Sequence, residues 1–136
     1  MKFFVPGKPY GKSRPRTRVV GNYATIYTEP KALAKEAFIR ECCALQNGTV
    51  EPMCGYISVT IEAIFPIPKQ TSKKNTALML SGELKPNIKP DLDNIAKTVC
   101  DALNGYAFID DKQIVELIIK KKYGETAGTL VSVNQI

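Results

Sequence analysis

Four aspartates lie close together in the second half of the chain. Asp91 and Asp93 stand two apart in the run K-P-D-L-D-N-I-A-K, and Asp110 and Asp111 follow in I-D-D-K-Q-I. A single aspartate at the start of a helix is explained as an N-cap or as a partner of the helix dipole. Several carboxylates brought together repel one another and raise each other's pKa unless a cation intervenes. Oxygen ligands without nitrogen or sulfur suit Mg²⁺ or Mn²⁺.

Convergence of the four carboxylates depends on the elements that carry them. Segment 91–104 is predicted to be a helix, because apolar residues recur at helical spacing at Ile95, Val99 and Leu103. If the strand that follows runs beside the N-terminal end of this helix, one aspartate of the second pair can approach the first pair. The motif does not fit a calcium loop, because Ile95 stands where a third ligand belongs. A sugar-nucleotide D-x-D needs a larger chain.

Lys97 lies four residues after Asp93 and four before Asp101, so the three side chains share one face of the helix. It can stabilise charge that develops on a reacting phosphate or orient an attacking water. Alternatively, it forms a surface ion pair with Asp93 or Asp101, worth about 0.5 kcal/mol. The chain has no histidine, which excludes Ser–His and Cys–His catalysis. A metal-bound water is then the expected nucleophile.

The net charge of +6 suits an anionic partner such as nucleic acid, although many basic proteins bind none. The distribution of the basic residues is more informative than their number. Several lie in the first loop, near the start of a predicted short helix and just before the D-x-D motif, and we expect them to contact DNA phosphates: Lys8, Lys12, Arg14, Arg16, Lys73, Lys74 and Lys89. In a strand, Lys120, Lys121 and Lys122 alternate between faces, so all three cannot contact one surface.

The remaining patterns predict a single α+β domain over residues 1–136, with a mixed or antiparallel sheet and two main helices packed on it. We expect a hairpin over 17–28 that turns at Gly21-Asn22, and an alternating strand over 55–65. Residues 113–123 and 129–133 are predicted to pair as a second hairpin. A short helix is predicted to begin at Thr71 or Ser72 and to close at Gly82.

The first main helix is predicted to begin at Thr28 or Glu29 and to stop at Asn47-Gly48. Its expected apolar face consists of Ala34, Ala37, Phe38, Cys42 and Leu45. The four cysteines lack C-x-x-C spacing, so we interpret them as reduced, buried thiols rather than zinc ligands. No apolar run is long enough to span a membrane or to form a signal peptide, and a cytoplasmic location is expected.

The run K-P-D-L-D-N-I-A-K-T-V-C-D-A-L-N-G-Y-A-F-I-D-D-K-Q-I resembles the signature of the RusA family of Holliday junction resolvases, which are often of phage or prophage origin. The opening P-G-K-P-Y-G-K-S-R-P-R is similar to the first strand and basic loop of that family. The arginine-rich run that some members carry before D-x-D is replaced here by N-I-K-P. The specific motifs are concentrated in 89–114, and the resemblance spans most of the chain.

The resemblance implies a homodimeric, Mg²⁺-dependent endonuclease of DNA recombination and repair that nicks a four-way junction symmetrically; Mn²⁺ is expected to substitute. The metal-site aspartates of the family fall on Asp91, Asp93 and Asp111, and its motif lysine falls on Lys97. Asp110 is an adjacent ligand or a supporting acid. Two alternatives are a noncatalytic DNA-binding protein of the same fold and a metal nuclease that prefers forks or flaps.

Overall fold

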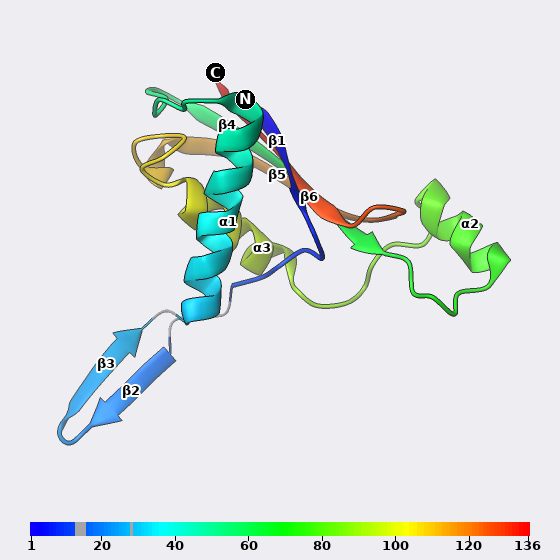
Figure 1. Cartoon of the computed structure of the whole chain (residues 1–136), viewed down its shortest axis with the longest axis horizontal. Helices are drawn as coiled ribbons and strands as arrows, with labels where there is room; N and C mark the ends of the chain where they lie inside the picture. Colours follow the sequence, from blue (N-terminus) through cyan, green and yellow to red (C-terminus); the bar gives the residue numbers. More distant parts are fainter. Residues whose placement is uncertain (13–15, 28) are drawn as a thin grey trace.

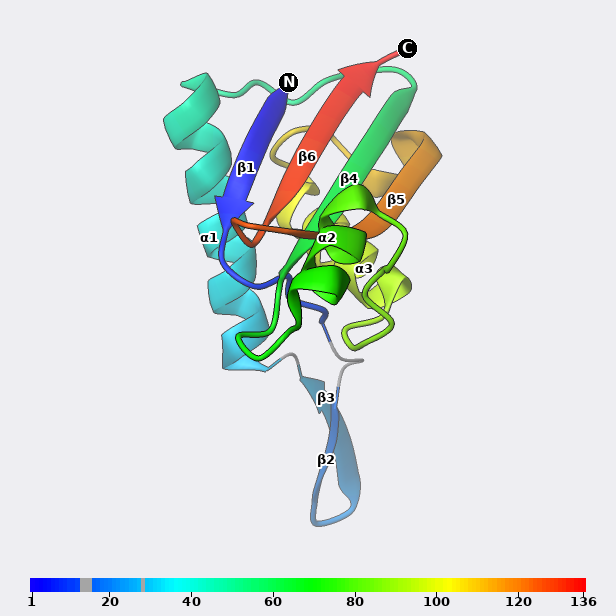
Figure 2. The ribbon, with the colours of Figure 1, turned by 90° about the vertical axis from the view of Figure 1, so that its right-hand side faces the viewer.

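A mixed four-stranded sheet, in the order β1-β6-β4-β5, positions the other elements. Its strands are β1 (Lys2–Pro6), β4 (Ile57–Pro66), β5 (Ile114–Gly124) and β6 (Gly128–Gln135). The computed structural model describes residues 1–12, 16–27 and 29–136, and the side chains of Arg16 and Tyr27 also lie outside the description. β4 pairs in parallel with β5 and antiparallel with β6, which in turn pairs antiparallel with β1. Figure 2 shows the four strands in this order.

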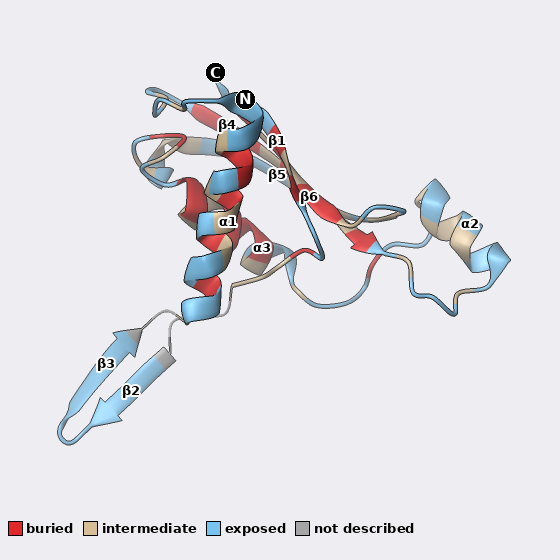
Figure 3. Cartoon of the chain, in the orientation of Figure 1, coloured by how far each residue is buried: buried red, intermediate tan, exposed pale blue. Residues whose placement is uncertain are grey.

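Two helices, α1 (Pro30–Asn47) and α3 (Leu92–Leu103), pack on the same side of the sheet (Figure 1). The shorter α2 (Lys73–Ser81) stands apart from them. A separate two-stranded ribbon, β2 (Arg16–Val20) and β3 (Tyr23–Tyr27), turns at Gly21-Asn22 and is exposed along its described length (Figures 1 and 3). The α+β class, the mixed sheet, the two main helices and the first hairpin were therefore predicted correctly.

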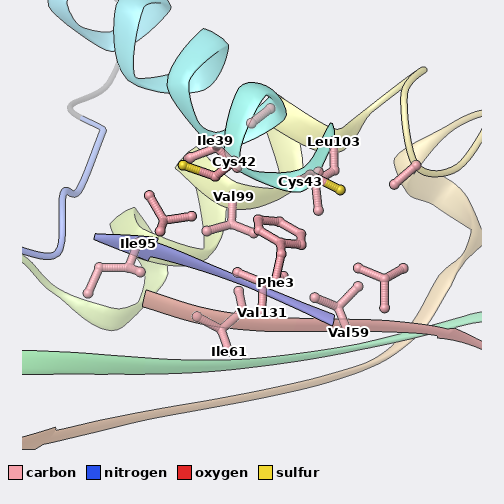
Figure 4. Packing of buried hydrophobic residues seen from close by; sticks show 14 of the residues in the cluster. Phe3, Ile39, Cys42, Cys43, Val59, Ile61, Ile95, Val99, Leu103 and Val131 are labelled. Atoms are coloured by element: carbon pink, nitrogen blue, oxygen red, sulfur yellow. The ribbon is translucent and has the colours of Figure 1, made fainter. Parts of the chain in front are cut away.

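The core lies between the sheet and the two main helices. The inward residues of β4 are all fully buried, which confirms the alternation predicted for this strand: Ile57, Val59, Ile61, Ala63 and Phe65. They pack against residues of α1 and α3, among them Ile39, Val99 and Leu103 (Figure 4). Full burial of one such aliphatic side chain stabilises the fold by about 1.5–3 kcal/mol, so this layer fixes where α3 lies.

The ends of the helices follow the predicted signals. Glu29 is the N-cap residue of α1, whereas Thr28 lies outside the described residues. The hydroxyl of Ser72 accepts a hydrogen bond from the Asn75 main-chain N–H at 3.2 Å and so caps α2. At its other end, α2 is followed by Gly82 in the left-handed conformation, with φ of 88°.

The predicted buried face of α1 was only partly right: Cys42 is buried and Phe38 packs against the core, but the other three residues are exposed. Its buried residues are Ala32, Glu36, Ile39, Cys42 and Cys43, whereas Leu45 is 80% exposed. The buried stripe contains a charged residue, Glu36, which a search for apolar residues alone passes over. The next apolar candidates at helical spacing, Ala34 and Ala37, lie on the solvent side. All four cysteines are free; Cys54 is exposed, contrary to the prediction that the thiols are buried.

The predicted hairpin of the last two strands was also wrong, although both strands exist. β5 and β6 do not pair with each other, because β4 lies between them and pairs with both. α3 carries the chain back across the sheet between β4 and β5, which makes these two strands parallel neighbours. β4 has the most completely buried inward face of the sheet and takes the central place, which leaves β5 at one edge.

Candidate functional site

The D-x-D motif lies at the N-terminal end of α3. Asp91 occupies the N-cap position, but its carboxylate makes no capping hydrogen bond, and Asp93 lies in the first turn. Both residues are exposed. Within the described residues, neither carboxylate has a hydrogen-bond or ion-pair partner, so helix capping does not account for this pair. Their oxygens are available to a cation or another ligand.

A groove of about 410 Å³ opens beside Asp91. Lys8 and Tyr10 line it from the loop after β1, and Lys89 and Pro90 line it from the segment that leads into α3. Lys8 and Lys89 are exposed, so two basic residues and one acidic residue line the same depression. An acidic group flanked by cations in a groove can accept a phosphodiester that the acidic group alone would repel.

The first loop is held against α3 by close packing and hydrogen bonds. The main-chain N–H of Lys12 donates to the Thr98 hydroxyl at 2.7 Å and to the Asn94 carbonyl at 3.2 Å. A β-carbon added at Gly11 would lie 2.4 Å from the β-carbon of Pro90, closer than two carbons approach. Gly11 therefore permits the loop to cross directly over the start of α3.

Lys12 does not present its ammonium group to solvent, contrary to the prediction that it contacts DNA. Its Nζ lies 2.8 Å from Oδ2 of Asp101 and 3.5 Å from Oε2 of Glu36, and its side chain is only 10% exposed. Burial opposes the positive charge, but the hydrogen bond and charge of Asp101, together with the charge of Glu36, raise the pKa of Lys12 above 10.5. The residue is an internal tie between the loop, α1 and α3.

Sequence reasoning missed this ion-pair cluster of Lys12, Glu36 and Asp101. One signal for it was present: Glu36 lies at helical spacing between Ala32 and Ile39, in a stripe that is otherwise buried. A carboxylate in such a stripe requires a buried partner, and Lys12 supplies it.

Lys97 projects into solvent one turn after Asp93. Its Nζ lies 3.1 Å from Oδ1 of Asp101, and its side chain is 59% exposed. The predicted ion pair with Asp101 is therefore present. Asp101 is 17% exposed and uses its two oxygens for different lysines, Oδ2 for Lys12 and Oδ1 for Lys97. A largely buried carboxylate thus pairs with the ammonium group of the exposed Lys97 side chain.

Asp110 and Asp111 lie at the opposite end of α3 from the D-x-D motif. The main-chain N–H of Asp111 donates to Oδ1 of Asn104, the residue that follows the helix, at 3.1 Å. Asp110 begins the 3-10 turn Asp111–Gln113 and accepts from the Lys112 N–H at 3.0 Å. That hydrogen bond is the main reason that the pKa of Asp110 is lowered. The strand after Asp111 therefore starts beside the C-terminal end of the helix, which differs from the approach considered from sequence.

The candidate site residues are spread along one face of α3 and do not converge on one point. Asp93, Lys97 and Cys100 lie on this face, and Cys100 is about 10 Å along the helix from Asp93. Burial, followed by the charges of Asp101 and Asp111, raises the pKa of the Cys100 thiol to about 11, which places Asp111 at this end of α3. Within residues 1–12, 16–27 and 29–136, no three Asp, Glu or Cys side chains are grouped closely enough to hold a metal ion.

The other predicted DNA contacts are dispersed. Lys73 and Lys74 are exposed in the first turn of α2. Arg14 lies outside the described residues, and Arg16 is described only by its backbone at the start of β2. In β5, Lys122 pairs with Glu62 at 3.4 Å and Lys121 donates to the Ile88 carbonyl, so neighbouring lysines do face different partners.

Comparison with known proteins identifies the family. The family model described as "Endodeoxyribonuclease RusA" matches residues 6–134. The chain is also 32% identical to the Bacillus subtilis (strain 168) protein "Uncharacterized protein YqaN", over an alignment that covers 100% of this chain and 96% of that protein. None of the described helices is both long and apolar enough to cross a membrane. With a family match over nearly its whole length, the chain belongs to the RusA family of endodeoxyribonucleases.

Proposed function

We propose that the protein is a structure-selective endonuclease that resolves Holliday junctions by paired symmetric nicks and requires Mg²⁺, with Mn²⁺ able to replace it. The observation that carries the proposal is the groove in which Lys8 and Lys89 flank Asp91, in a chain of the RusA family. The lysines attract the phosphodiester, and the acids beside it provide ligands of the type that a hard cation prefers.

The donor atoms, carboxylate oxygens, are of the type that the proposed cation prefers. Asp91 and Asp93 are exposed, and neither carboxylate is used within the described residues. Asp111 and Asp110 supply further carboxylates from the other end of α3. A bound Mg²⁺ would lower the pKa of a coordinated water and offset charge on the phosphate. The family resemblance assigns Asp91, Asp93 and Asp111 as the principal ligands and Asp110 as an adjacent acid; because Asp111 lies at the far end of α3, one ion held by Asp91 and Asp93 does not reach it within a single chain.

Lys97 is proposed to stabilise negative charge on the phosphate oxygens. Its side chain is exposed, and Asp101 holds Nζ from one side at 3.1 Å. Such a lysine reaches the surface with less freedom than an untethered one. Lys8, Lys73, Lys74 and Lys89, with Arg14 and Arg16, are proposed to contact the DNA backbone. Lys12 is left out of this set because its ammonium group is buried against two carboxylates.

The decisive test is nicking of a synthetic four-way junction by Asp91→Asn, Asp93→Asn and Asp111→Asn variants, with and without Mg²⁺. We expect each variant to lose cleavage while it retains or tightens junction binding, because phosphate repulsion falls. Glu125→Gln, which removes an exposed acid in the turn between β5 and β6, serves as the matched control and should cut normally. Wild-type cleavage by all three variants would reduce the acids to surface features.

Two measurements separate the alternatives. Titration of Mg²⁺ or Mn²⁺ should give binding that Asp91→Asn abolishes; a wild-type chain that binds junctions but neither binds metal nor cuts is a noncatalytic DNA-binding protein. Cleavage of junction, fork, flap and linear duplex should be compared at one salt concentration. Faster cleavage of forks or flaps would move the preferred substrate away from the junction.

Paired nicks require two active sites, and we therefore propose that the protein acts as a homodimer on branched DNA. A two-fold symmetric pair of sites matches the two-fold symmetry of a four-way junction. Light scattering of the purified protein gives the number of copies, and cleavage kinetics of a junction in a supercoiled plasmid show whether both nicks occur in one encounter.

A further inference from the structure

The two edges of the four-stranded sheet are treated differently by the rest of the chain. At the β1 edge, the main-chain N–H of Phe4 donates to Oε1 of Gln46 at 2.9 Å, and Nε2 of Gln46 donates to the Phe4 carbonyl at 2.7 Å. The amide of Asn47 donates to the Lys2 carbonyl at 3.2 Å. These side chains at the end of α1 satisfy the groups to which another strand would bond. The β1 edge is closed.

The β5 edge is open. β5 is 11 residues long and pairs with β4 alone (Figure 2). At its start, the Ile114 N–H donates to the Asp111 carbonyl, and α2 lies near β5; over residues 115–124, no main-chain hydrogen bond to an element other than β4 is found in the described part of the chain. Val115, Leu117 and Ile118 are 58%, 44% and 43% exposed. A long exposed edge with apolar side chains is a template for another strand, and monomeric proteins avoid it.

The sequence of β5 is complementary to itself when it is read in the opposite direction. We propose that β5 pairs antiparallel with β5 of a second copy, about a two-fold axis through Ile118. In this register Glu116 lies opposite Lys120, Leu117 lies opposite Ile119, and Ile118 faces its own copy. The two-fold axis makes the opposite-charge pair occur twice, and each such cross-strand pair is favourable.

The charged residues of this register project from the sheet face away from α1 and α3. Glu116 stands beside Ser58 of β4, whose hydroxyl donates to Oε1 of Glu116 at 2.6 Å, and Lys120 stands beside Glu62. A shift of the axis by one residue in either direction places Ile118 opposite Glu116 or Lys120. Only the axis through Ile118 matches charge with charge and apolar with apolar side chains throughout 116–120.

We call this antiparallel contact between the β5 strands of two copies the β5 seam. It rests on the proposed homodimer and names its interface, and its test needs neither metal nor DNA. Its test is disulfide trapping of Ile118→Cys in a background with Cys54→Ser and Cys100→Ala, under mild oxidation and without DNA. Facing residues of antiparallel strands have Cα atoms about 4.5–5.5 Å apart, which is within the range of a disulfide. We expect a cross-linked dimer on a non-reducing gel.

The matched control is Lys120→Cys in the same background. Two copies of residue 120 are offset by four residues along the seam, about 14 Å, so this variant should not cross-link. The double variant Glu116→Cys with Lys120→Cys should cross-link. The seam is refuted if Lys120→Cys cross-links as readily as Ile118→Cys. It is also refuted if the protein is a dimer but Ile118→Cys never forms the cross-link.

A second measurement does not depend on cysteine. Lys120→Glu should raise the dimer dissociation constant about tenfold, because two attractive pairs become repulsive, and Lys120→Glu with Glu116→Lys should restore it. Light scattering over a dilution series measures both, and a dissociation constant that neither change moves argues against the register. If the protein cross-links at Ile118 but never nicks DNA, the proposed function is refuted and the seam stands. If it nicks DNA but does not form this contact, the seam is refuted and the proposed function stands.

Discussion

Replacement of Asp101 by Asn should destabilise the fold more than any other single loss of an acid on α3. Asp101 accepts from Lys12 at 2.8 Å with both side chains nearly buried, and a hydrogen bond between charged groups contributes about 1.5–3 kcal/mol. The pair with Lys97, which is 59% exposed, adds only about 0.3–0.5 kcal/mol. In the variant, the asparagine oxygen and Glu36, whose Oε2 lies 3.5 Å from Nζ of Lys12, would still interact with Lys12 and so offset part of the lost stabilisation. The net loss should be about 2 kcal/mol.

Urea unfolding at pH 7, followed by circular dichroism, measures this loss. Because the pKa of Lys12 is raised above 10.5, its contribution is complete below pH 10.5 and is lost only as the pH rises through the folded-state value. Asp93→Asn is the matched control, since it removes an exposed acid of the same helix and should cost less than about 1 kcal/mol. If Asp101→Asn loses no more stability than Asp93→Asn, the internal tie does not hold the loop on α3.

Three further outcomes are expected. Gly11→Ala forces the loop away from α3, because its β-carbon would lie 2.4 Å from that of Pro90; urea unfolding should show a loss of stability, and junction binding should weaken. Asp110→Asn should destabilise the protein at pH 7, with the difference vanishing as the pH falls below 3.8, because the lowered pKa stabilises the fold only while the carboxylate is charged; unfolding at several pH values tests this. Lys8→Ala with Lys89→Ala should reduce the slope of log binding constant against log salt by about 2, measured by fluorescence anisotropy, if each lysine contacts one phosphate.

The elements of the fold were predictable because each carries its own local signal. The strict alternation in β4, the Gly21-Asn22 turn and the Ser72 cap act over a few residues, and the structure confirms all three. The pairing of β5 was not predictable in this way. A turn between two strands favours a hairpin locally, but here the apolar β4 occupies the place between them.

The candidate site was predictable in its residue types and only partly in its arrangement. The basic loop and the D-x-D motif do line one groove, as expected if basic residues bring DNA to the acids. Lys12 and Lys8 look equivalent in sequence, yet one is buried in an ion-pair cluster and the other is exposed. That difference depends on Glu36 and Asp101, residues far from the loop in the chain, and on the long-range packing of α1 against α3.

The two hydrogen bonds between the Gln46 side-chain amide and the Phe4 main chain have a consequence for solubility. If two copies join through β5, the combined sheet ends on both sides at a β1 strand whose outer groups are already satisfied by Gln46 and Asn47. Growth of this sheet therefore stops at two copies, since the two-fold contact is closed and the combined sheet, considered apart from the separate β2-β3 ribbon, has no free edge among its described strands. Gln46→Leu would expose the Phe4 main chain at both ends and turn a closed pair into the unit of an open-ended ribbon. In the proposed dimer, the side-chain amides of Gln46 and Asn47 would therefore keep the sheet from extending into an aggregate.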